Sequence, residues 1–334
     1  MTKDHDVSRR EFIRRLLGLG LSAAAAASLF SAFCCRQAGV SEADAEREKR
    51  QPEAAAPAKT SSNAAYPYLA VARGGQPSAM AEAVVDALGG MGRFVRPGAD
   101  VIIKPNICVG YRSLEYAATT NPEVVGAVTR MCLQAGAKRV RVMDAPFSGT
   151  AASAYDMSGI AEAVKASGGE MEIMSGMKYR EIAIPLGSII RSWPVYGDVP
   201  DADVLINIPI AKHHASTRLT LGMKNLLGVV KSPNQFHQRG LHECIAELST
   251  AVRPTLNLVD AVRILTRGGP TGGNLNDVKV TNTLIASIDI VAADAYAATL
   301  FNLKGSDIEY IRRAADLGVG SMDLDQVMIE EIDV

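Results

Sequence analysis

The segment "TNPEVVGAVTRMCLQAGAKRVRVMD" (residues 120–144) joins a predicted helix to a predicted strand. Thr120 or Asn121 can cap the helix, because a short polar side chain accepts hydrogen bonds from the first backbone N–H groups. Pro122 suits the first turn of this helix, and Gly136 suits its end. The closing letters "KRVRVMD" alternate charged residues with valine and predict a strand. Helix and strand therefore follow each other with only a short connection.

The same alternation continues on both sides of this segment. Predicted strands are "DVIIK" (100–104), "ADVLINIP" (202–209) and "TLNLVDAV" (255–262). Predicted helices lie near 158–167, at "GLHECIAELSTAV" (240–252), at "VAADAYAATLF" (291–301), which follows "TNTLIASIDI" (281–290), and near 307–317. The predicted fold class is therefore α/β, with a mostly parallel sheet flanked by helices on both faces.

The first 36 residues have the pattern of an export signal. "SRREFIRR" (8–15) is followed by eighteen uncharged, mostly small or apolar residues (16–33). The paired Arg9 and Arg10 resemble a twin-arginine signal, which implies export of the folded chain by the twin-arginine machinery to the periplasm or another extracytoplasmic space. An ordinary secretory signal and an uncleaved membrane anchor are the alternatives. Lipidation at Cys34 is not favoured, because Phe33 stands where a small residue is wanted.

Two further parts follow the signal. Residues 37–65 contain nine alanines and nine charged residues and no aromatic residue, which predicts a disordered linker. Residues 66–334 are predicted to form a single α/β domain. Contact with a membrane is expected only through the N-terminal segment, if that segment is not cleaved.

Charge and cysteine content exclude some classes of function. The net charge of −1 gives no basis for nucleic-acid binding. Past the signal, Cys108, Cys132 and Cys244 are widely spaced and no CxxC pair exists. We therefore expect neither an iron–sulfur cluster nor a zinc ion held by cysteines alone, and the sequence names no cofactor.

Polar residues follow the predicted strands directly. They are Lys104, Asn106, Asp144, the run from Asn207 to His214, and Asp260. Ligands of parallel sheets bind beyond the carboxyl ends of the strands, so these groups are expected to converge. Lys104 and Asn106 could clamp a carboxylate or phosphate there; an exposed lysine and a turn asparagine are the alternative reading. Asp144 opens the loop "DAPFSGT", which is either an anion-binding loop or a simple turn.

Two other segments have open interpretations. "RGGPTGGN" (267–274) lacks P-loop spacing and is read first as a flexible turn and second as a phosphate cradle. Asp289 is predicted to cap the helix that follows it. Asp294 lies inside that alanine-rich helix, where a carboxylate needs a partner, and a cation from the histidine-rich segment is the expected one.

The segment "IPIAKHHASTRLTLGMKNLLGVVKSPNQFHQRGLH" (208–242) contains four of the five histidines of the chain. Lys212 and His214 share one face if this part is extended. Residues 217–228 have helical spacing, with Thr217, Thr220 and Lys224 on neighbouring turns and Gly228 at the end. His237 and His242 flank the start of the next helix, and His213 is expected to point away from His214.

Three interpretations of this histidine-rich segment remain open. One is acid–base chemistry on a bound anion by a histidine beside a lysine of lowered pKa. Another is metal binding through imidazoles, although no HxxxH spacing is present. The last is a structural role for partly buried histidines in a long loop.

Taken in order, the landmarks resemble the family known as domain of unknown function 362. They are "IIKPN" (102–106), "INIPIAKHH" (206–214), "LTLGMKNLLGVV" (219–230), "FHQRGLHECIAEL" (236–248), "LVDAV" (258–262), "GGPTGG" (268–273) and "SIDIVAADAYAA" (287–298). The resemblance implies functional roles for Lys212, His214, Lys224-Asn225 and His242. A weaker analogy is with nickel-dependent lactate racemases, of which no motif is matched.

The leading hypothesis is an exported enzyme that binds an anionic small molecule or cofactor, with isomerase and oxidoreductase classes left open. A periplasmic solute- or cofactor-binding protein and a metal-dependent enzyme with histidine ligands are the alternatives. The predicted catalytic residues are His214, Lys212, Asp144 and His242. The predicted ligand-binding residues are Lys104, Asn106, Asn207, Lys224, Asn225, His237, Asp260 and Asp294, and no metal ligand is assigned.

Overall fold

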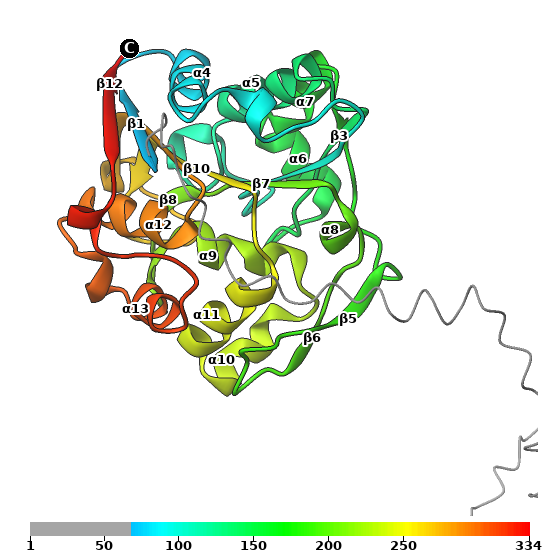
Figure 1. The fold of residues 1–334 in the computed structure, drawn as a ribbon, viewed down its shortest axis with the longest axis vertical. Coiled ribbons are helices and arrows are strands. Elements are labelled where there is room, and N and C mark those ends of the chain that lie inside the picture. The colour runs from blue at the N-terminus through cyan, green and yellow to red at the C-terminus, as the bar shows by residue number, and fades with distance from the viewer. Residues whose placement is uncertain (1–67) are drawn as a thin grey trace, which may run out of the picture. The chain divides into compact units, whose positions relative to one another are not determined.

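The computed structural model describes residues 68–334 (Figure 1). The predicted export signal and linker lie outside these residues. One sheet contains ten strands: β1 (Leu69–Arg73), β2 (Asp100–Pro105), β3 (Arg139–Val142), β4 (Glu170–Met171), β7 (Val204–Ile208), β8 (Ile210–His214), β9 (Arg218–Thr220), β10 (Leu256–Leu265), β11 (Val278–Ser287) and β12 (Ile329–Asp333). A separate antiparallel pair consists of β5 (Tyr179–Ala183) and β6 (Ser192–Tyr196).

The helices of the described part of the chain are α4 (Pro77–Ala87), α5 (Pro122–Gln134), α6 (Ala151–Met157), α7 (Ile160–Ala166), α8 (Asp198–Asp201), α9 (Gly222–Asn225), α10 (Phe236–Arg239), α11 (Leu241–Ala251), α12 (Ile290–Thr299) and α13 (Glu309–Asp316). In these residues no helix combines the length and the apolar character that crossing a membrane requires.

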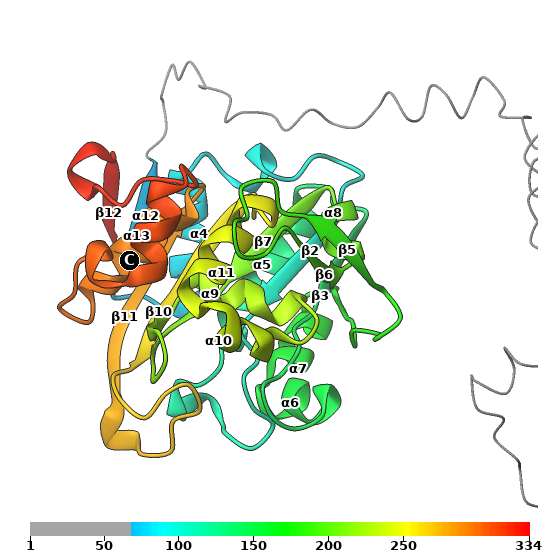
Figure 2. The ribbon, with the colours of Figure 1, turned by 90° about the horizontal axis from the view of Figure 1, so that it is seen from below.

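The sheet runs in the order β12-β1-β11-β10-β7-β2-β3-β4, with β8 beside β10 and β9 beside β8. Among residues 68–334, six of its nine strand pairings are parallel and three are antiparallel. The view in Figure 2 shows β10 and β11 toward one side and β2 and β3 toward the other. The predicted α/β class with a mostly parallel sheet is confirmed.

Both faces of the sheet are covered, because successive strand residues point to opposite sides. In β2, Ile102 packs into the core on one face, while Val101 and Ile103 pack into the core on the other. Helices α4, α5 and α7 cover the second of these faces, and α9, α11, α12 and α13 cover the first (Figure 1). The central strands are consequently apolar throughout, as strands buried on both faces are.

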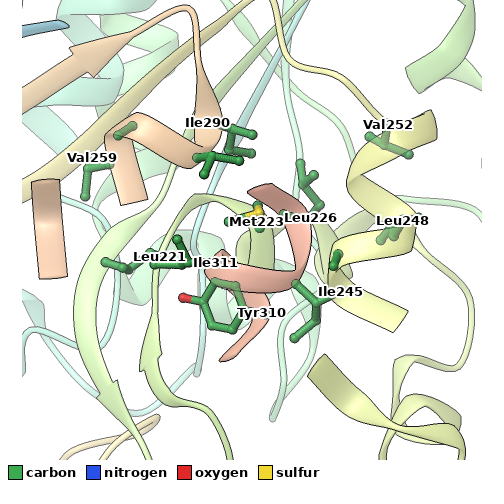
Figure 3. Close-up of a cluster of buried hydrophobic side chains, with 14 of the residues drawn as sticks. Leu221, Met223, Leu226, Ile245, Leu248, Val252, Val259, Ile290, Tyr310 and Ile311 are labelled. Carbon is green, nitrogen blue, oxygen red and sulfur yellow. The ribbon is translucent and has the colours of Figure 1, made fainter. Parts of the chain in front are cut away.

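The core under the first face holds the short helix α9 in place (Figure 3). Met223 lies in α9, and Leu226 directly follows the last residue of that helix. Both side chains pack with Ile245 of α11, Ile290 of α12 and Ile311 of α13. All five side chains are buried. A four-residue helix has little stability of its own, so this packing determines where its polar residues lie.

The start of α5 follows the sequence prediction. Asn121 is the N-cap, and its side chain accepts a hydrogen bond from Glu123 N–H at 2.9 Å. A second hydrogen bond runs from the backbone N–H of Asn121 to the Asp260 carboxylate of β10, at 2.7 Å. The cap therefore ties α5 to the centre of the sheet.

The helical prediction for residues 217–228 is wrong in its first part. Arg218–Thr220 forms strand β9, which pairs antiparallel with β8, and the helix is limited to α9 and a following 3₁₀ turn, η3 (Leu226–Val229). Arg218 has a φ of 62°, which a helix does not allow. The chain after Pro209 is extended, as expected, but it is a paired strand, β8, and not a loop.

Candidate functional site

A cavity of about 300 Å³ lies beyond the carboxyl ends of β2 and β3 and beside β8. This is the position that parallel sheets offer to ligands. Eight of the twelve predicted site residues line the cavity: Lys104, Asn106, Asp144, Lys212, His214, Lys224, Asn225 and His237. The lining contains three lysines and one carboxylate, so it carries an excess of positive charge.

Lys104 and Asp144 form a buried ion pair at the base of the cavity. The distance from Lys104 Nζ to Asp144 Oδ1 is 2.7 Å, and both side chains are almost completely buried. Asp144 Oδ2 also accepts a hydrogen bond from Ile107 N–H at 2.6 Å. Burial lowers the pKa of Lys104 and raises the pKa of Asp144, while the opposite charge offsets part of each shift. The pair links the end of β2 to the end of β3.

Lys212 is buried without a carboxylate partner. Its ammonium donates to Asn106 Oδ1 at 2.9 Å and to the Ala118 carbonyl at 2.6 Å. Its side chain extends from β8 on the same side as that of His214, since the two residues alternate with His213 along the strand. The structure thus places Lys212 and His214 together in the cavity wall.

Four asparagines continue from Lys212 as a chain of hydrogen bonds, here called the amide chain (Asn106, Asn225, Asn207 and Asn257). Asn106 Nδ2 donates to Asn225 Oδ1 at 2.9 Å, and Asn225 Nδ2 donates to Asn207 Oδ1 at 2.8 Å. Asn207 Nδ2 then donates to Asn257 Oδ1 at 3.1 Å. Every carboxamide therefore points the same way, with its oxygen toward Lys212. Asn207, predicted to bind ligand, lies behind Asn225 and outside the cavity lining.

Lys224 differs from the other two lysines, because no acceptor within residues 68–334 pairs with its ammonium. It belongs to α9, which the core of Figure 3 fixes in place. Burial, and then the charge of Lys212, lowers the pKa of Lys224 to about 8. Of the three lysines in the described cavity wall, Lys224 is therefore the one whose ammonium is available to a ligand.

Thr220 of β9 supplies a second polar group without a partner. Its side chain is 4% exposed and lines the cavity, and Oγ1 has no hydrogen-bond partner in the described part of the chain. A buried hydroxyl without a partner costs about 1–3 kcal/mol of folding free energy. A ligand with an acceptor atom would satisfy it.

His214 is held as a neutral ring. Burial lowers its pKa to about 3, and the charges of Lys224 and Lys212 act in the same direction. His214 Nδ1 accepts a hydrogen bond from Ser216 N–H at 3.1 Å, so the neutral ring carries its hydrogen on Nε2. His214 is therefore a hydrogen-bond donor at neutral pH.

The other histidines of the segment separate. His237 of α10 lines the cavity from its exposed side, and burial followed by the charge of Lys224 lowers its pKa. His213 Nδ1 accepts a hydrogen bond from Gly269 N–H at 3.2 Å. The loop containing Gly269 contributes Pro270 to the cavity wall.

Three predicted site residues have other surroundings. His242 lies outside the cavity, 3.8 Å from Glu309 and stacked on Tyr310. Asp260 caps α5 as described above, and burial raises its pKa to about 6. Contrary to expectation, no cation of residues 68–334 pairs with Asp294: its oxygens accept hydrogen bonds from the N–H groups of Gly222 and Met223, at the start of α9, at 2.6 and 3.0 Å.

Several residues of the cavity wall were not recognised as site residues in the sequence, among them Thr220, Cys108 and Gly228. Cys108 lines the cavity two positions after Asn106, in the same turn, and that proximity was the available signal. A Cβ atom on Gly228 would lie 1.9 Å from Asp144 Oδ1 and 2.6 Å from Lys104 Nζ. Only glycine allows the backbone to approach the ion pair so closely.

Part of the cavity wall is apolar. It includes Ile107, Pro146, Phe147, Leu227 and Pro270. Phe147 is 68% exposed although it is a large apolar side chain. A ligand that fits both halves of the cavity combines an anionic group with an apolar part.

The described residues contain no group of three or more His, Cys, Asp or Glu side chains arranged to hold a metal ion. The metal-dependent alternative therefore gains no support from their geometry.

A family model with the description "Domain of unknown function (DUF362)" matches residues 101–299. The matched range includes every residue that lines the cavity. The chain belongs to this family. A relative within it is the thylakoid-associated protein sll1697 of Synechocystis sp., with 30% identity over 244 residues, covering 71% of this chain and 73% of the relative.

A solved structure with partial similarity is the lactate racemase apoprotein from Thermoanaerobacterium thermosaccharolyticum. The identity is 10% and the TM-score is 0.43, over 66% of the DUF362 chain and 54% of the racemase. The match thus spans about half the length of that protein, and similarity at this level carries no inference about activity.

Proposed function

We propose that this DUF362 protein is an enzyme that binds an anionic small molecule in the cavity and moves a proton through Lys224. The observation that carries the proposal is the ammonium of Lys224, which faces an electropositive cavity without a partner. A lysine pKa of about 8 leaves part of the side chain neutral near physiological pH. Both forms needed for proton transfer are then populated.

The neighbouring groups have complementary roles in this proposal. His214 and Thr220 donate hydrogen bonds to the anion, and Lys212 adds positive charge. This assignment moves the proton-transfer role predicted for His214 to Lys224, because a histidine with a pKa of about 3 is neutral throughout the physiological range. The ion pair of Lys104 and Asp144 holds the base of the site together.

Calorimetric titration with a panel of small carboxylates and phosphates tests the binding step. Lys224→Met should lower the affinity by about 10- to 100-fold, as expected for loss of a charge-assisted hydrogen bond. Affinity of the unmodified protein should fall as the pH rises above about 8, where the ammonium loses its proton. Lys165→Met, on the exposed surface of α7, is the matched control and should bind like the unmodified protein.

Proton exchange separates an enzyme from a carrier. Each compound that binds is incubated with the protein in D₂O, and NMR follows loss of its C–H signals. Exchange that requires Lys224 supports the enzyme, whereas binding without exchange or turnover favours a solute- or cofactor-binding protein. Equal affinity of Lys224→Met and the unmodified protein for every anion would remove the proposal.

For localisation, we propose export by the twin-arginine machinery, on the basis of Arg9-Arg10 and the apolar run that follows. Changing both arginines to lysine should retain the folded protein inside the cytoplasm. Cell fractionation of the two forms measures this. Export of the lysine form at an unchanged level would show that another route is used.

A further inference from the structure

Cys108 has a fixed position in the cavity wall. Its side chain is 6% exposed, and its Sγ lies 3.6 Å from the Pro270 carbonyl. Its backbone N–H donates to Thr119 Oγ1 at 3.3 Å, and its carbonyl accepts from Phe147 N–H at 2.8 Å. Cys108 therefore lines the ligand cavity, and on its other side it packs in a small apolar cluster with Val109 and Ala118.

The other cysteines of the described chain have a different environment. Cys132 and Cys244 are completely buried in the two apolar cores. Burial raises the pKa of Cys132 to about 12 and that of Cys244 to about 11, so both stay as unreactive thiols. Cys108, in contrast, lines the same cavity as Lys104 and Lys224.

We propose that Cys108 is the nucleophile of this cavity and bonds to an electrophilic carbon of the anionic ligand. The proposal rests on the proposed function, since Lys224 must hold the anion beside the thiol. The partnerless hydroxyl of Thr220, buried in the same wall, independently indicates a ligand at this place. The ligand class is a carboxylate or phosphate that carries a carbonyl carbon next to its anionic group.

The bonding step is balanced by groups already in the cavity. Sulfur forms a bond to the carbonyl carbon, and the π electrons of the carbonyl move to its oxygen, which takes a proton from the ammonium of Lys224. The thiol proton then passes to the amine of Lys224 and restores its charge. The product is a thiohemiacetal, and its formation requires neither an oxidant nor a reductant.

The nucleophile is tested by alkylating the folded protein with iodoacetate, which is an anion, and with iodoacetamide, which is neutral. In both reactions sulfur bonds to carbon, iodide leaves, and the thiol proton goes to a base. Peptide mass spectrometry gives the rate at each cysteine, with glutathione as the reference thiol. We expect modification at Cys108 and not at Cys132 or Cys244, with an iodoacetate-to-iodoacetamide rate ratio about tenfold above that of glutathione.

The Lys224→Met variant and two protecting anions complete the test. In the variant the rate ratio should fall to that of glutathione, while iodoacetamide still labels Cys108. Glyoxylate, which has a carbonyl carbon, should slow labelling by iodoacetamide more than acetate does. An unreactive Cys108, a rate ratio equal to that of glutathione, or equal protection by both anions overturns this proposal. Calorimetry on the same samples shows separately whether anion binding, and with it the proposed function, survives.

Discussion

At the scale of single residues, Asp144 and Asp294 are buried in different ways. Asp144 is neutralised by Lys104 at 2.7 Å, whereas the partners of Asp294 in the described part of the chain are backbone N–H groups. Backbone dipoles offset less of the cost of burying a charge than a cation does. Burial therefore raises the pKa of Asp294 to about 7, and the charge of Asp289 adds to the effect.

This raised pKa predicts a pH-dependent stability. In the unfolded chain Asp294 loses its proton near pH 4, but in the folded chain only near pH 7. Between these values the folded state binds more protons, so the free energy of unfolding falls as the pH rises, by at most about 1.4 kcal/mol per pH unit. Asp294→Asn removes the titration.

Urea unfolding of both proteins at pH 4, 5, 6 and 7 measures the difference in stability. The stability of the unmodified protein minus that of Asp294→Asn should fall over this range and level off above it. A constant difference would show that Asp294 does not titrate there.

At the scale of the elements, the turn η3 has to pass close to the buried ion pair. Gly228 lies in that turn, and its carbonyl accepts a hydrogen bond from Ala145 N–H at 3.2 Å. We predict that Gly228→Ala lowers the free energy of unfolding by about 3 kcal/mol or more, because the methyl group would overlap Asp144 and Lys104. Both of those side chains are buried and cannot move away.

Thermal unfolding of Gly228→Ala measures this loss. Gly176→Ala is the control, since no atom lies within 4 Å of a Cβ built there, and its effect should stay within about 0.5 kcal/mol. Similar results for the two variants would mean that η3 shifts without cost.

The helices and strands also show how much of the fold could be predicted from the sequence alone. Periodicity and caps were sufficient for α5, where Asn121, Pro122 and Gly136 have the predicted places. The pairing of β8 with β10 could not be predicted, because the partner strand begins more than forty residues later and no local pattern identifies it. Residues 217–228 were predicted as helix because their apolar spacing suits one, while pairing with β8 overrides that preference in β9.

The site was predictable to the extent that it follows strand ends. Lys104, Asp144 and Lys212 could be placed in one crevice from strand order alone. The hydrogen bonds that distinguish Lys224 from Lys212 come from long-range packing, and a single sequence contains no signal for them. The position of Cys108 in the cavity wall was indicated only by its closeness to Asn106 in the chain.

At the scale of the whole molecule, the C-terminal strand closes one edge of the sheet. β12 pairs parallel with β1, and Figure 1 shows the two strands side by side. Leu69, Ala70, Val71 and Ala72 of β1 are completely buried in this arrangement. An uncovered apolar edge strand invites association with other chains.

We predict that deleting Ile329–Val334 lowers the free energy of unfolding by on the order of 3 kcal/mol and promotes aggregation. Urea unfolding and light scattering measure the two effects. Glu331→Gln, which removes only the partly exposed ion pair with Arg73, should cost less than about 1 kcal/mol. A deletion variant as stable and monomeric as this control would show that β1 does not need its neighbour.

The hydrogen bonds of the amide chain all run in one direction. Rotating any one of its carboxamides by half a turn would place an NH₂ group against a donor, either the ammonium of Lys212 or the NH₂ of the preceding asparagine. No member can therefore reverse alone, and reversal of all of them is blocked at Lys212, which has no acceptor to offer. The four amides therefore share one orientation, and two ammonium groups fix it: Lys212 donates to Asn106 Oδ1, and Lys104 donates to Asn225 Oδ1 at 2.8 Å.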